Sequence, residues 1–370
     1  MNKQDIIIDL NQSINSNSEE FKSLSFDLQG NILSPHARDN AAHIFIEFKN
    51  PQSARKFIKY YLVDRITSSA KQKADSDAFK TGESNGLRTF INFSFSIKKE
   101  LNKAAKSIYV EIGKGITNNE GNHIEHFGYV DGISKPHMLT DKIDDGKVSI
   151  VNWNPKGRLN LALVEDPGGQ GPNSFGSYLI FRKLDQNVKA FRLAEQKLAE
   201  KMQISIDYAG AQMVGRYRNG TPLIPISPPQ PTSAGKMNDF NYSSDRTTGS
   251  KCPFGSHIRK TNQRNSSIPD GVQFPRRGIT YGGNLSENAE SGVGLLFMAY
   301  NSNIGSQFEF MQSSWANSTG FPGGANSPNG IDSIIGQGND TGGQVYFKEW
   351  GNDSSVLREI KSLGGFVTMK

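Results

Sequence analysis

The chain has 370 residues, 35% of them hydrophobic and 21% charged, and a formal net charge of +6. This composition is typical of a globular protein and excludes a disordered chain, and the length suggests two domains or two fused halves. Lysines and arginines are scattered singly and in pairs, so we expect no nucleic-acid partner. The single cysteine, Cys252, excludes an intramolecular disulfide and a CxxC metal site.

The amino-terminal stretch is polar and rich in Asn and Ser, which predicts a flexible arm over residues 1–22. It lacks the basic segment and apolar run of a secretory signal. No apolar run anywhere approaches the roughly 18 residues of a membrane span. We therefore expect a cytoplasmic protein with no membrane partner.

A first half is predicted over residues 23–173. Residues 43–48, HIFIEF, alternate like a strand, residues 54–63 have helical spacing, and residues 87–95 read as a second strand. Residues 117–136 are rich in Gly, Asn and His and predict a long loop of the kind that usually serves function.

The second half, residues 174–370, opens with the same order of elements. A strand is predicted at 176–184, a helix with an apolar stripe at 187–201, an apolar strand at 294–300 and a helix at 304–315. Two α+β halves, each carrying a long loop, are the economical interpretation.

Several common catalytic motifs are absent. No Gly-Lys pair is followed by Ser or Thr, so the phosphate-binding P-loop is missing. HIEH at residues 123–126 is not the HExxH pattern of zinc proteases, and no GxSxG sequence lies between a strand and a helix. These absences weaken the nucleotide-binding and hydrolase interpretations.

Three short segments remain as candidates for chemistry. They are FGYVDGIS at residues 127–134, CPFGSHIRKTNQR at residues 252–264 and FPRRGITYG at residues 274–282. Each is weak alone, because a GxxDG turn is often an Asx turn, an arginine pair is often a solvated surface, and one histidine among six is usually structural. Their combination, in this order, is specific.

With LQGNIL, GSYLIFRKL, MVGRYRNGTPL and QFEFMQSSW, these segments make the chain resemble the dye-decolourising (DyP-type) haem peroxidases. The resemblance covers nearly all of the chain after the arm. It implies an α+β fold of two ferredoxin-like halves, each an antiparallel β-sheet flanked by helices in a dimeric α/β-barrel-like arrangement. Haem b is then expected mainly in the C-terminal half, with the glycine-framed loop over its distal face.

The resemblance also implies roles for individual residues. His257 matches the axial ligand of the haem iron, Asp131 the distal acid and Arg276 the distal arginine. Arg276 is preferred to its neighbour because it lies six residues before the glycine of the YG pair. Glu309 is a candidate acceptor for the second ring nitrogen of His257.

Other residues are candidates for contact with the haem. Arg216 and Arg264 are candidates for the haem propionates, and Leu295 and Phe297 share one face of a strand that either lines the pocket or is ordinary core. The set of expected cofactor-binding residues is Gly132, Ile133, Ser134, Arg216, Arg264, Leu295 and Phe297. Tyr129 stands where the family often has Phe, which leaves Asp131 unaffected.

The expected activity is that of a haem b peroxidase using hydrogen peroxide to oxidise phenolic or dye-like donors in one-electron steps. Asp131 would move a proton between the peroxide oxygens, and Arg276 would stabilise the developing negative charge. The alternative is a haem-binding carrier or iron-release protein without significant peroxidase turnover. The sequence leaves open the donor, the choice between monomer and homodimer, and which Trp or Tyr, if any, relays electrons.

Overall fold

The computed structural model describes residues 23–24, 40–48, 105–134, 158–165, 175–224, 231, 238, 240–264, 270–322, 329–338, 343–359 and 366–369. The chain divides into two compact units, Met1–Gly115 and Ile116–Lys370. The glycine-framed loop and the histidine and arginine segments therefore belong to one unit. The division into halves at residue 173 stays a prediction.

The first unit contains a three-stranded sheet in the order β1 (Ser23–Leu24), β2 (Asn40–Phe48), β3 (Ala105–Lys114). β1 pairs with β2 in parallel, and β2 pairs with β3 antiparallel. β2 confirms the strand predicted at 43–48. The helix predicted at 54–63 and the strand predicted at 87–95 lie outside the described residues.

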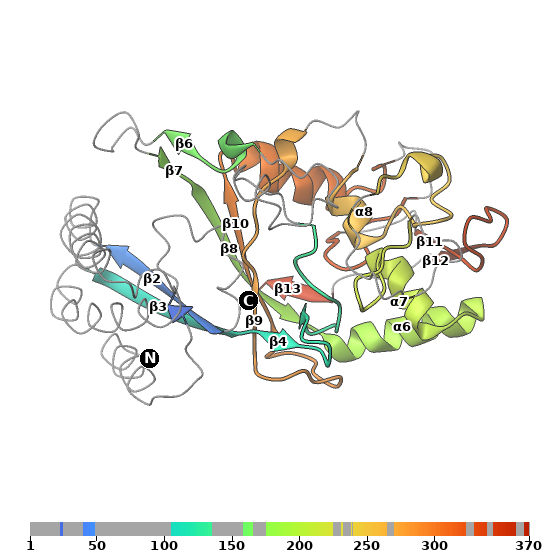
Figure 1. Cartoon of the computed structure of the whole chain (residues 1–370), viewed down its shortest axis with the longest axis horizontal. Coiled ribbons are helices and arrows are strands. Elements are labelled where there is room, and N and C mark those ends of the chain that lie inside the picture. The colour runs from blue at the N-terminus through green and yellow to red at the C-terminus, as the bar shows by residue number, and fades with distance from the viewer. Residues whose placement is uncertain are drawn as a thin grey trace, which may run out of the picture. The chain divides into compact units, whose positions relative to one another are not determined.

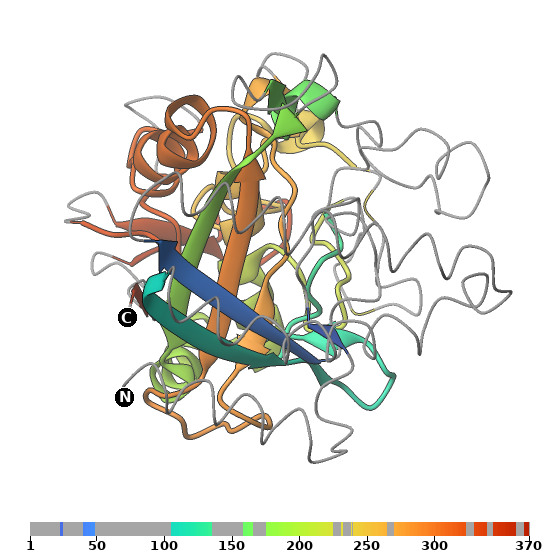
Figure 2. The ribbon, with the colours of Figure 1, turned by 90° about the vertical axis from the view of Figure 1, so that its left-hand side faces the viewer.

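The second unit is built around a four-stranded antiparallel sheet. Its order is β13 (Val367–Met369), β8 (Tyr178–Gln186), β10 (Gly294–Asn301), β9 (Ile279–Tyr281) (Figure 1). The long strands β8 and β10 lie side by side, green and orange in Figure 2. They confirm the strands predicted at 176–184 and 294–300.

Burial alternates along the first part of β10, as the period of a strand requires. Leu296 and Met298 are buried on one face, whereas Leu295 and Phe297 are only partly buried on the other. The strand begins at Gly294, where a Cβ atom would lie 1.8 Å from the carbonyl oxygen of Leu184. Only glycine allows the two strands to approach so closely there.

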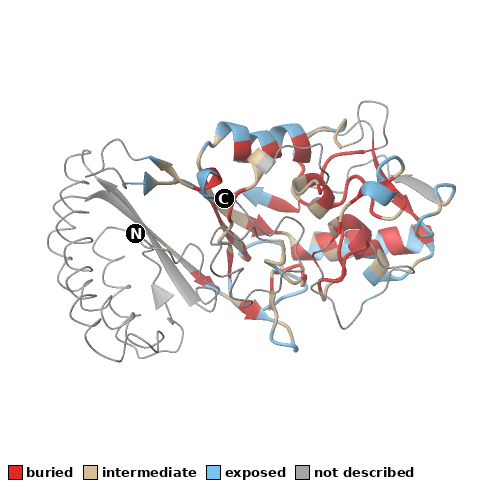
Figure 3. Ribbon diagram, turned by 45° about the horizontal axis from the view of Figure 1, so that its top comes forward, coloured by how far each residue is buried: buried red, intermediate tan, exposed pale blue. Residues whose placement is uncertain are grey.

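Helix α6 (Val188–Met202) confirms the helix predicted at 187–201 and is followed by α7 (Ile206–Val214). Asn187 caps α6, because its side-chain oxygen accepts a hydrogen bond from the backbone N–H of Ala190 at 2.9 Å. The buried stripe of α6 packs in a core cluster with Phe127 and Tyr129. Figure 3 shows buried and exposed residues alternating along this helix, which therefore shields one side of the core.

The helix predicted at 304–315 is present but has a wider turn than an α-helix. It consists of the π-helical segments η7 (Gly305–Glu309) and η8 (Met311–Ala316). Its buried side chains Gln307, Met311 and Trp315 recur every four residues. Over so few turns, the apolar pattern predicts a helix without distinguishing its hydrogen-bond repeat.

The remaining described elements are short. They are the strand pairs β4 (Ile116–Thr117) with β5 (His123–Ile124), β6 (Val164–Glu165) with β7 (Phe175–Gly176) and β11 (Gln344–Phe347) with β12 (Val356–Glu359), the helix α8 (His257–Thr261), and the 3-10 turns η4 (Leu159–Leu161), η5 (Ser243–Asp245) and η6 (Asp270–Val272). In the part of the chain that the structure describes, no helix has both the length and the apolar character to cross a bilayer.

Candidate functional site

His257 is the first residue of α8, and the backbone around it is fixed by α7. The hydroxyl of Ser256, the residue before it, donates to the carbonyl oxygen of Gln212 in α7. α7 ends at Gly215 with φ +96°, and a Cβ atom there would lie 2.4 Å from Cγ1 of Ile258. Glycine at this position therefore lets α8 pack against the end of α7.

The ring of His257 is oriented by Asp332. Its Nδ1–H donates to Oδ2 of Asp332 at 2.9 Å, and the carboxylate is completely buried. The other carboxylate oxygen accepts the backbone N–H groups of Ile334 and Ile335 at 2.8 and 2.9 Å. A carboxylate held by three donors cannot turn away, so it fixes both the tautomer and the orientation of the ring.

This contact corrects one of our predictions. Glu309, which we expected to accept from His257, is exposed on the π-helical segment, and Asp332 takes its place. Glutamates are common on surface helices. The sequence around Glu309 resembles the family, but this does not show in which direction its carboxylate points.

Burial and the neighbouring charges act in opposite directions on the pKa of His257. Loss of water around the ring lowers its pKa most, but the charge of Asp332 and the hydrogen bond to it outweigh that effect, and the net shift is upward. The side chain keeps 31% of its surface exposed. Its Nε2 has no hydrogen-bond partner among the described residues, which leaves this nitrogen available as a ligand.

The glycine-framed loop is held from inside by Glu125. Its carboxylate accepts the backbone N–H groups of Phe127 at 2.8 Å and Tyr129 at 3.0 Å, and the side chain of Gln186 also donates to it. Burial raises the pKa of Glu125, these hydrogen bonds oppose the rise, and the charge of Asp131 adds to it. This role of Glu125 was not predicted, because nothing in the sequence distinguishes it from a surface residue.

Asp131 lies in the part of this loop that faces solvent. Its backbone N–H donates to the carbonyl oxygen of His123 at 3.0 Å, while the residue itself is exposed. Gly128 and Gly132 on either side have φ +86° and +81°, which explains the glycine frame. The loop therefore presents the carboxylate of Asp131 to solvent, on a backbone whose conformation is constrained.

Arg276 connects this loop to the sheet. Its backbone forms an isolated antiparallel bridge with Ala299 of β10, and its Nη2 donates to the carbonyl oxygen of Ser134 at 3.5 Å. Its charge is near enough to His257 to act against protonation of that ring. The structure thus brings Arg276 to the end of the glycine-framed loop, residues 127–134. Its charge also acts on the ring of His257, the predicted iron ligand.

Three further predicted residues meet in one cluster. Arg216 and Arg264 both donate to Oδ1 of Asn238, the first at 2.9 Å, and Arg264 also donates to Oγ of Ser134 at 2.9 Å. Both guanidinium groups lie over the ring of Phe240, at 5.3 and 4.0 Å. Burial, together with the charge of Arg264, lowers the pKa of Arg216 to about 9.

Two buried guanidinium groups that repel each other form a place where an anion is stabilised. Arg216 and Arg264, beside Ser134 of the glycine-framed loop, therefore suit the two propionates of a haem. Asn238 is a member of the cluster that the sequence did not indicate, since it lies in a polar stretch without periodic pattern. The residues present therefore fit the expected cofactor: a ring nitrogen available for iron at one point and paired cations at another.

The other candidate cofactor-binding residues lie on different elements. Gly132 and Ile133 lie on the glycine-framed loop and are partly buried. Leu295 packs near Gly278, and Phe297 lies 5.9 Å from the ring of Phe308 in a hydrophobic cluster, an arrangement that also suits ordinary core. Their contact with a cofactor stays a prediction.

In the described ranges, no three His, Cys, Asp or Glu side chains gather around one point where they could hold a metal ion. His126, from the HIEH segment, is fully buried, and its Nε2 lies 2.7 Å from the carbonyl oxygen of Tyr281. This contact assigns it a structural role.

Comparison with known proteins gives the class of this fold and site. The family model for the Dyp-type peroxidase C-terminal region matches residues 124–322, more than half of the chain. The chain belongs to the Dyp-type peroxidase family.

Among individual relatives, the multifunctional dye peroxidase DyP2 of Amycolatopsis sp. is 43% identical over 286 residues, 70% of this chain and 60% of that protein. A dye-decolorizing peroxidase of Exidia glandulosa is 31% identical over 302 residues, 74% of this chain and 58% of that protein. The matched region thus spans less than two thirds of these curated relatives.

Solved structures match over most of their length. The structure of DyP2 from Amycolatopsis sp. has a TM-score of 0.75 at 31% identity, covering 93% of this chain and 92% of that chain. An Anabaena sp. DyP-type peroxidase has a TM-score of 0.74 at 30% identity, covering 95% and 96%. The α+β fold of the family is therefore shared.

Proposed function

We propose that this protein is a haem b peroxidase that uses hydrogen peroxide to oxidise phenolic or dye-like donors by one-electron steps. The observation that carries the proposal is the geometry of His257: Nδ1 is engaged by a buried carboxylate, Nε2 is available, and Arg276 lies close enough to influence the ring. The division into two ferredoxin-like halves, with the haem mainly in residues 174–370, is part of the same proposal.

Bound haem would supply an iron that accepts peroxide and holds oxidising equivalents until donors return electrons. In this proposal His257 binds the iron through Nε2. The hydrogen bond to Asp332 makes the imidazole more basic, which favours an oxidised iron. Arg216 and Arg264, together with Ser134, hold the propionates.

On the distal side, the chain's own residues divide the work of breaking the O–O bond. Asp131 accepts a proton from the near oxygen of peroxide and returns it to the leaving oxygen. Arg276 is always charged and stabilises the negative charge that develops on the leaving oxygen. Because the proton carrier is a carboxylate, we expect activity to favour acidic pH.

A haem carrier is the alternative function, since the same axial histidine serves both. The arrangement of Asp131 and Arg276 favours catalysis, because mere binding of haem requires neither. The names of the relatives support this choice, as dye peroxidases and dye-decolorizing peroxidases recur among them.

The test mixes haem-loaded protein with equimolar peroxide in a stopped-flow spectrometer. We expect the wild type to change its spectrum rapidly, His257→Ala to lose the haem, and Arg276→Leu to retain haem but react orders of magnitude more slowly. Arg277→Leu, the adjacent arginine, is the matched control and should react like the wild type. Full activity of Arg276→Leu would refute its distal role, and an unreactive wild type would favour the carrier.

A further inference from the structure

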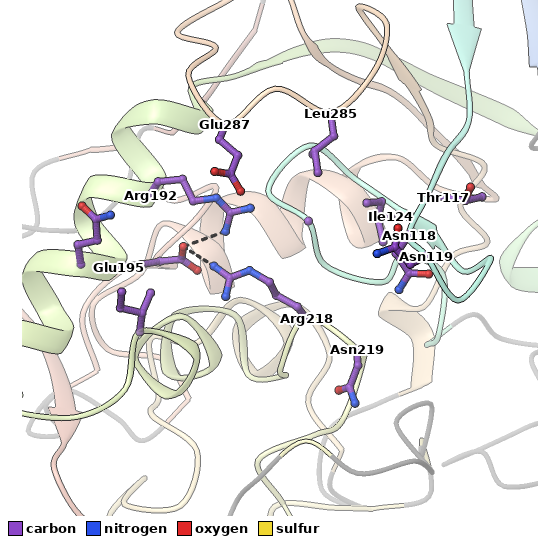
Figure 4. Close-up of a pocket in the computed structure, with 13 residues that line it drawn as sticks. Thr117, Asn118, Asn119, Ile124, Arg192, Glu195, Arg218, Asn219, Leu285 and Glu287 are labelled. Atoms are coloured by element: carbon purple, nitrogen blue, oxygen red, sulfur yellow. Dashed lines mark hydrogen bonds and ion pairs between the residues drawn. The ribbon is translucent and has the colours of Figure 1, made fainter.

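Two networks of buried polar side chains contact segments of the proposed site. The first lines a cavity of about 660 Å³ next to the glycine-framed loop, where the buried carboxylate of Glu195 accepts from Arg192 at 3.0 Å and from Arg218 at 2.6 Å (Figure 4). The second surrounds Asp332, the hydrogen-bond partner of His257. Because the second network contacts the segments of both His257 and Asp332, it can act directly on the proposed iron ligand.

Both neighbours of Asp332 are held by side chains of β11. Before Asp332, the carbonyl oxygen of Ile331 accepts a hydrogen bond from Nε2 of Gln344 at 2.9 Å. After it, the hydroxyl of Ser333 lies 3.0 Å from the hydroxyl of Tyr346. Gln344 and Tyr346 are two residues apart in the strand, so they share one of its faces. The turn that carries Asp332 is therefore attached to β11 at two points.

Ser333 also joins this turn to the segment before His257. Its backbone N–H and its hydroxyl both donate to the carbonyl oxygen of Gly255, each at 3.0 Å. Gly255 lies two residues before His257, and a Cβ atom on it would lie only 3.3 Å from the carbonyl oxygen of Ile331. The contact of Ser333 with Gly255 thus connects the same two segments as the hydrogen bond between His257 and Asp332.

The hydroxyl of Tyr346 completes the network. Because the hydroxyl hydrogen of Ser333 is given to the backbone, Tyr346 is the donor between them, and its single hydrogen is shared between Oγ of Ser333 and Oε1 of Gln344, the latter at 2.8 Å. Asp332, Ser333, Gln344 and Tyr346 have no exposed surface. Water therefore cannot replace a bond that is lost here, and the removal of one hydroxyl disturbs the groups attached to it.

We propose that Tyr346 and Ser333 are positioning residues for the iron ligand: they hold Asp332 at hydrogen-bond distance from His257, so that electron donation by the imidazole to bound iron is set from β11. A hydrogen bond weakens steeply as its length and angle change, so a small displacement of the turn is enough to alter that donation. The inference rests on the proposed function, because it requires haem bound through His257.

The first experiment uses Tyr346→Phe, which removes the hydroxyl and keeps the ring. In the reduced haem-loaded protein, the iron–histidine stretching band of the resonance Raman spectrum reports electron donation by the imidazole. We expect the band to move to lower frequency and the reduction potential of the iron to rise, because a weaker pull on Nδ1–H stabilises ferric iron less. Ser333→Ala should shift both in the same direction, and Asp332→Asn should shift them further.

Tyr242→Phe is the matched control, because Tyr242 is 3% exposed and its hydroxyl has no hydrogen-bond partner among the described residues. It loses the same atom without breaking a hydrogen bond and should keep the band and the potential of the wild type. Arg192→Lys, which alters the network of Figure 4 instead, should also leave the band in place. A shift in either control as large as that in Tyr346→Phe would refute a specific path.

A double-mutant cycle separates positioning from a general loosening of the interior. If Tyr346 acts through Asp332, Tyr346→Phe should cause no further shift of the band when it is combined with Asp332→Asn. Equal shifts with and without Asp332→Asn would show that Tyr346 acts independently of this carboxylate, and would overturn the proposal.

Hydrogen–deuterium exchange of the haem-loaded protein gives a readout that does not depend on the spectrum of the iron. The backbone N–H groups of Ile334 and Ile335 bond to Oδ1 of Asp332 at 2.8 and 2.9 Å. A loosened turn should expose them, so we expect exchange about fivefold faster in Tyr346→Phe and unchanged in Tyr242→Phe. Equal protection in the wild type and Tyr346→Phe would contradict the proposal.

Failure of this inference is distinguishable from failure of the proposed function. A wild type that shows no iron–histidine band, or a His257→Ala variant that retains the band, refutes the proposed function and this inference with it. A wild type that shows the band, with the same frequency and the same potential in Tyr346→Phe, refutes the inference alone.

Discussion

The imidazole of His257 donates from Nδ1 to a carboxylate 75 residues further along the chain, that of Asp332, across 2.9 Å. The carboxylate is itself fixed by the N–H groups of Ile334 and Ile335. The orientation of the predicted iron ligand thus depends on a turn that contributes no ligand of its own.

Replacing Asp332 should loosen haem without removing its ligand. Asp332→Asn keeps the shape but loses the charge that makes the imidazole basic, and we expect haem to dissociate about 10–100-fold faster. Transfer of haem to an excess of a scavenging protein measures the rate. Glu309→Gln is the control and should behave as the wild type; the reverse ranking of these two variants would restore Glu309 as the partner.

Gly215 should be intolerant of any side chain. In Gly215→Ala, the positive φ and the overlap with Ile258 should together cost about 3 kcal/mol of unfolding free energy. Gly283→Ala isolates the backbone contribution, because Gly283 has φ +89° and nothing within 4 Å of an added Cβ, and should cost about 1 kcal/mol. Urea denaturation compares them, and equal losses would show that the contact with Ile258 is unimportant.

His126 should make the protein acid-sensitive. Burial lowers its pKa below 6.5 in the folded chain, although the hydrogen bond to Tyr281 partly opposes this. The unfolded chain therefore takes up a proton first as pH falls, so the stability that neutral His126 provides is present above about pH 6.5 and decreases below it. Between pH 7.5 and pH 5, His126→Gln should lose less unfolding free energy than the wild type, and identical losses would contradict this assignment.

Cys252 should be inert in the folded protein. Burial raises the pKa of its thiol to about 11, so almost no thiolate exists at pH 8. Because it is the only cysteine, a thiol-reactive dye reports on it alone. We expect labelling only when denaturant unfolds the chain; modification of the native protein within minutes would show that the site opens locally.

The elements with strong periodicity were predictable from sequence. The segments that became β2, β8 and β10, and the apolar stripe of α6, are patterns visible within a few consecutive residues of the sequence. α7 was missed, because its nine residues, IDYAGAQMV, include Ala209, Gly210 and Ala211, three small residues that carry little periodic signal. β9 and β13 have three residues each, and only their neighbours in the sheet make them strands.

The site was predictable where a residue belongs to a motif. Ser134, Arg216 and Arg264 were singled out separately, and the structure brings them together around Asn238. Asp332 was not foreseen, because its role comes from tertiary packing and an isolated aspartate between Ile331 and Ser333 suggests only a turn. The cytoplasmic location and the oligomeric state stay predictions.

The distance in sequence between His257 and Asp332 bears on how the protein matures. Ribosomes add residues from the amino terminus, so the histidine leaves the ribosome well before the aspartate that fixes its tautomer. A nascent chain halted between them would present an imidazole free to rotate. On the proposed function, we therefore expect productive capture of haem only at a late stage of biogenesis, after the segment that contains Asp332 has been released and packed.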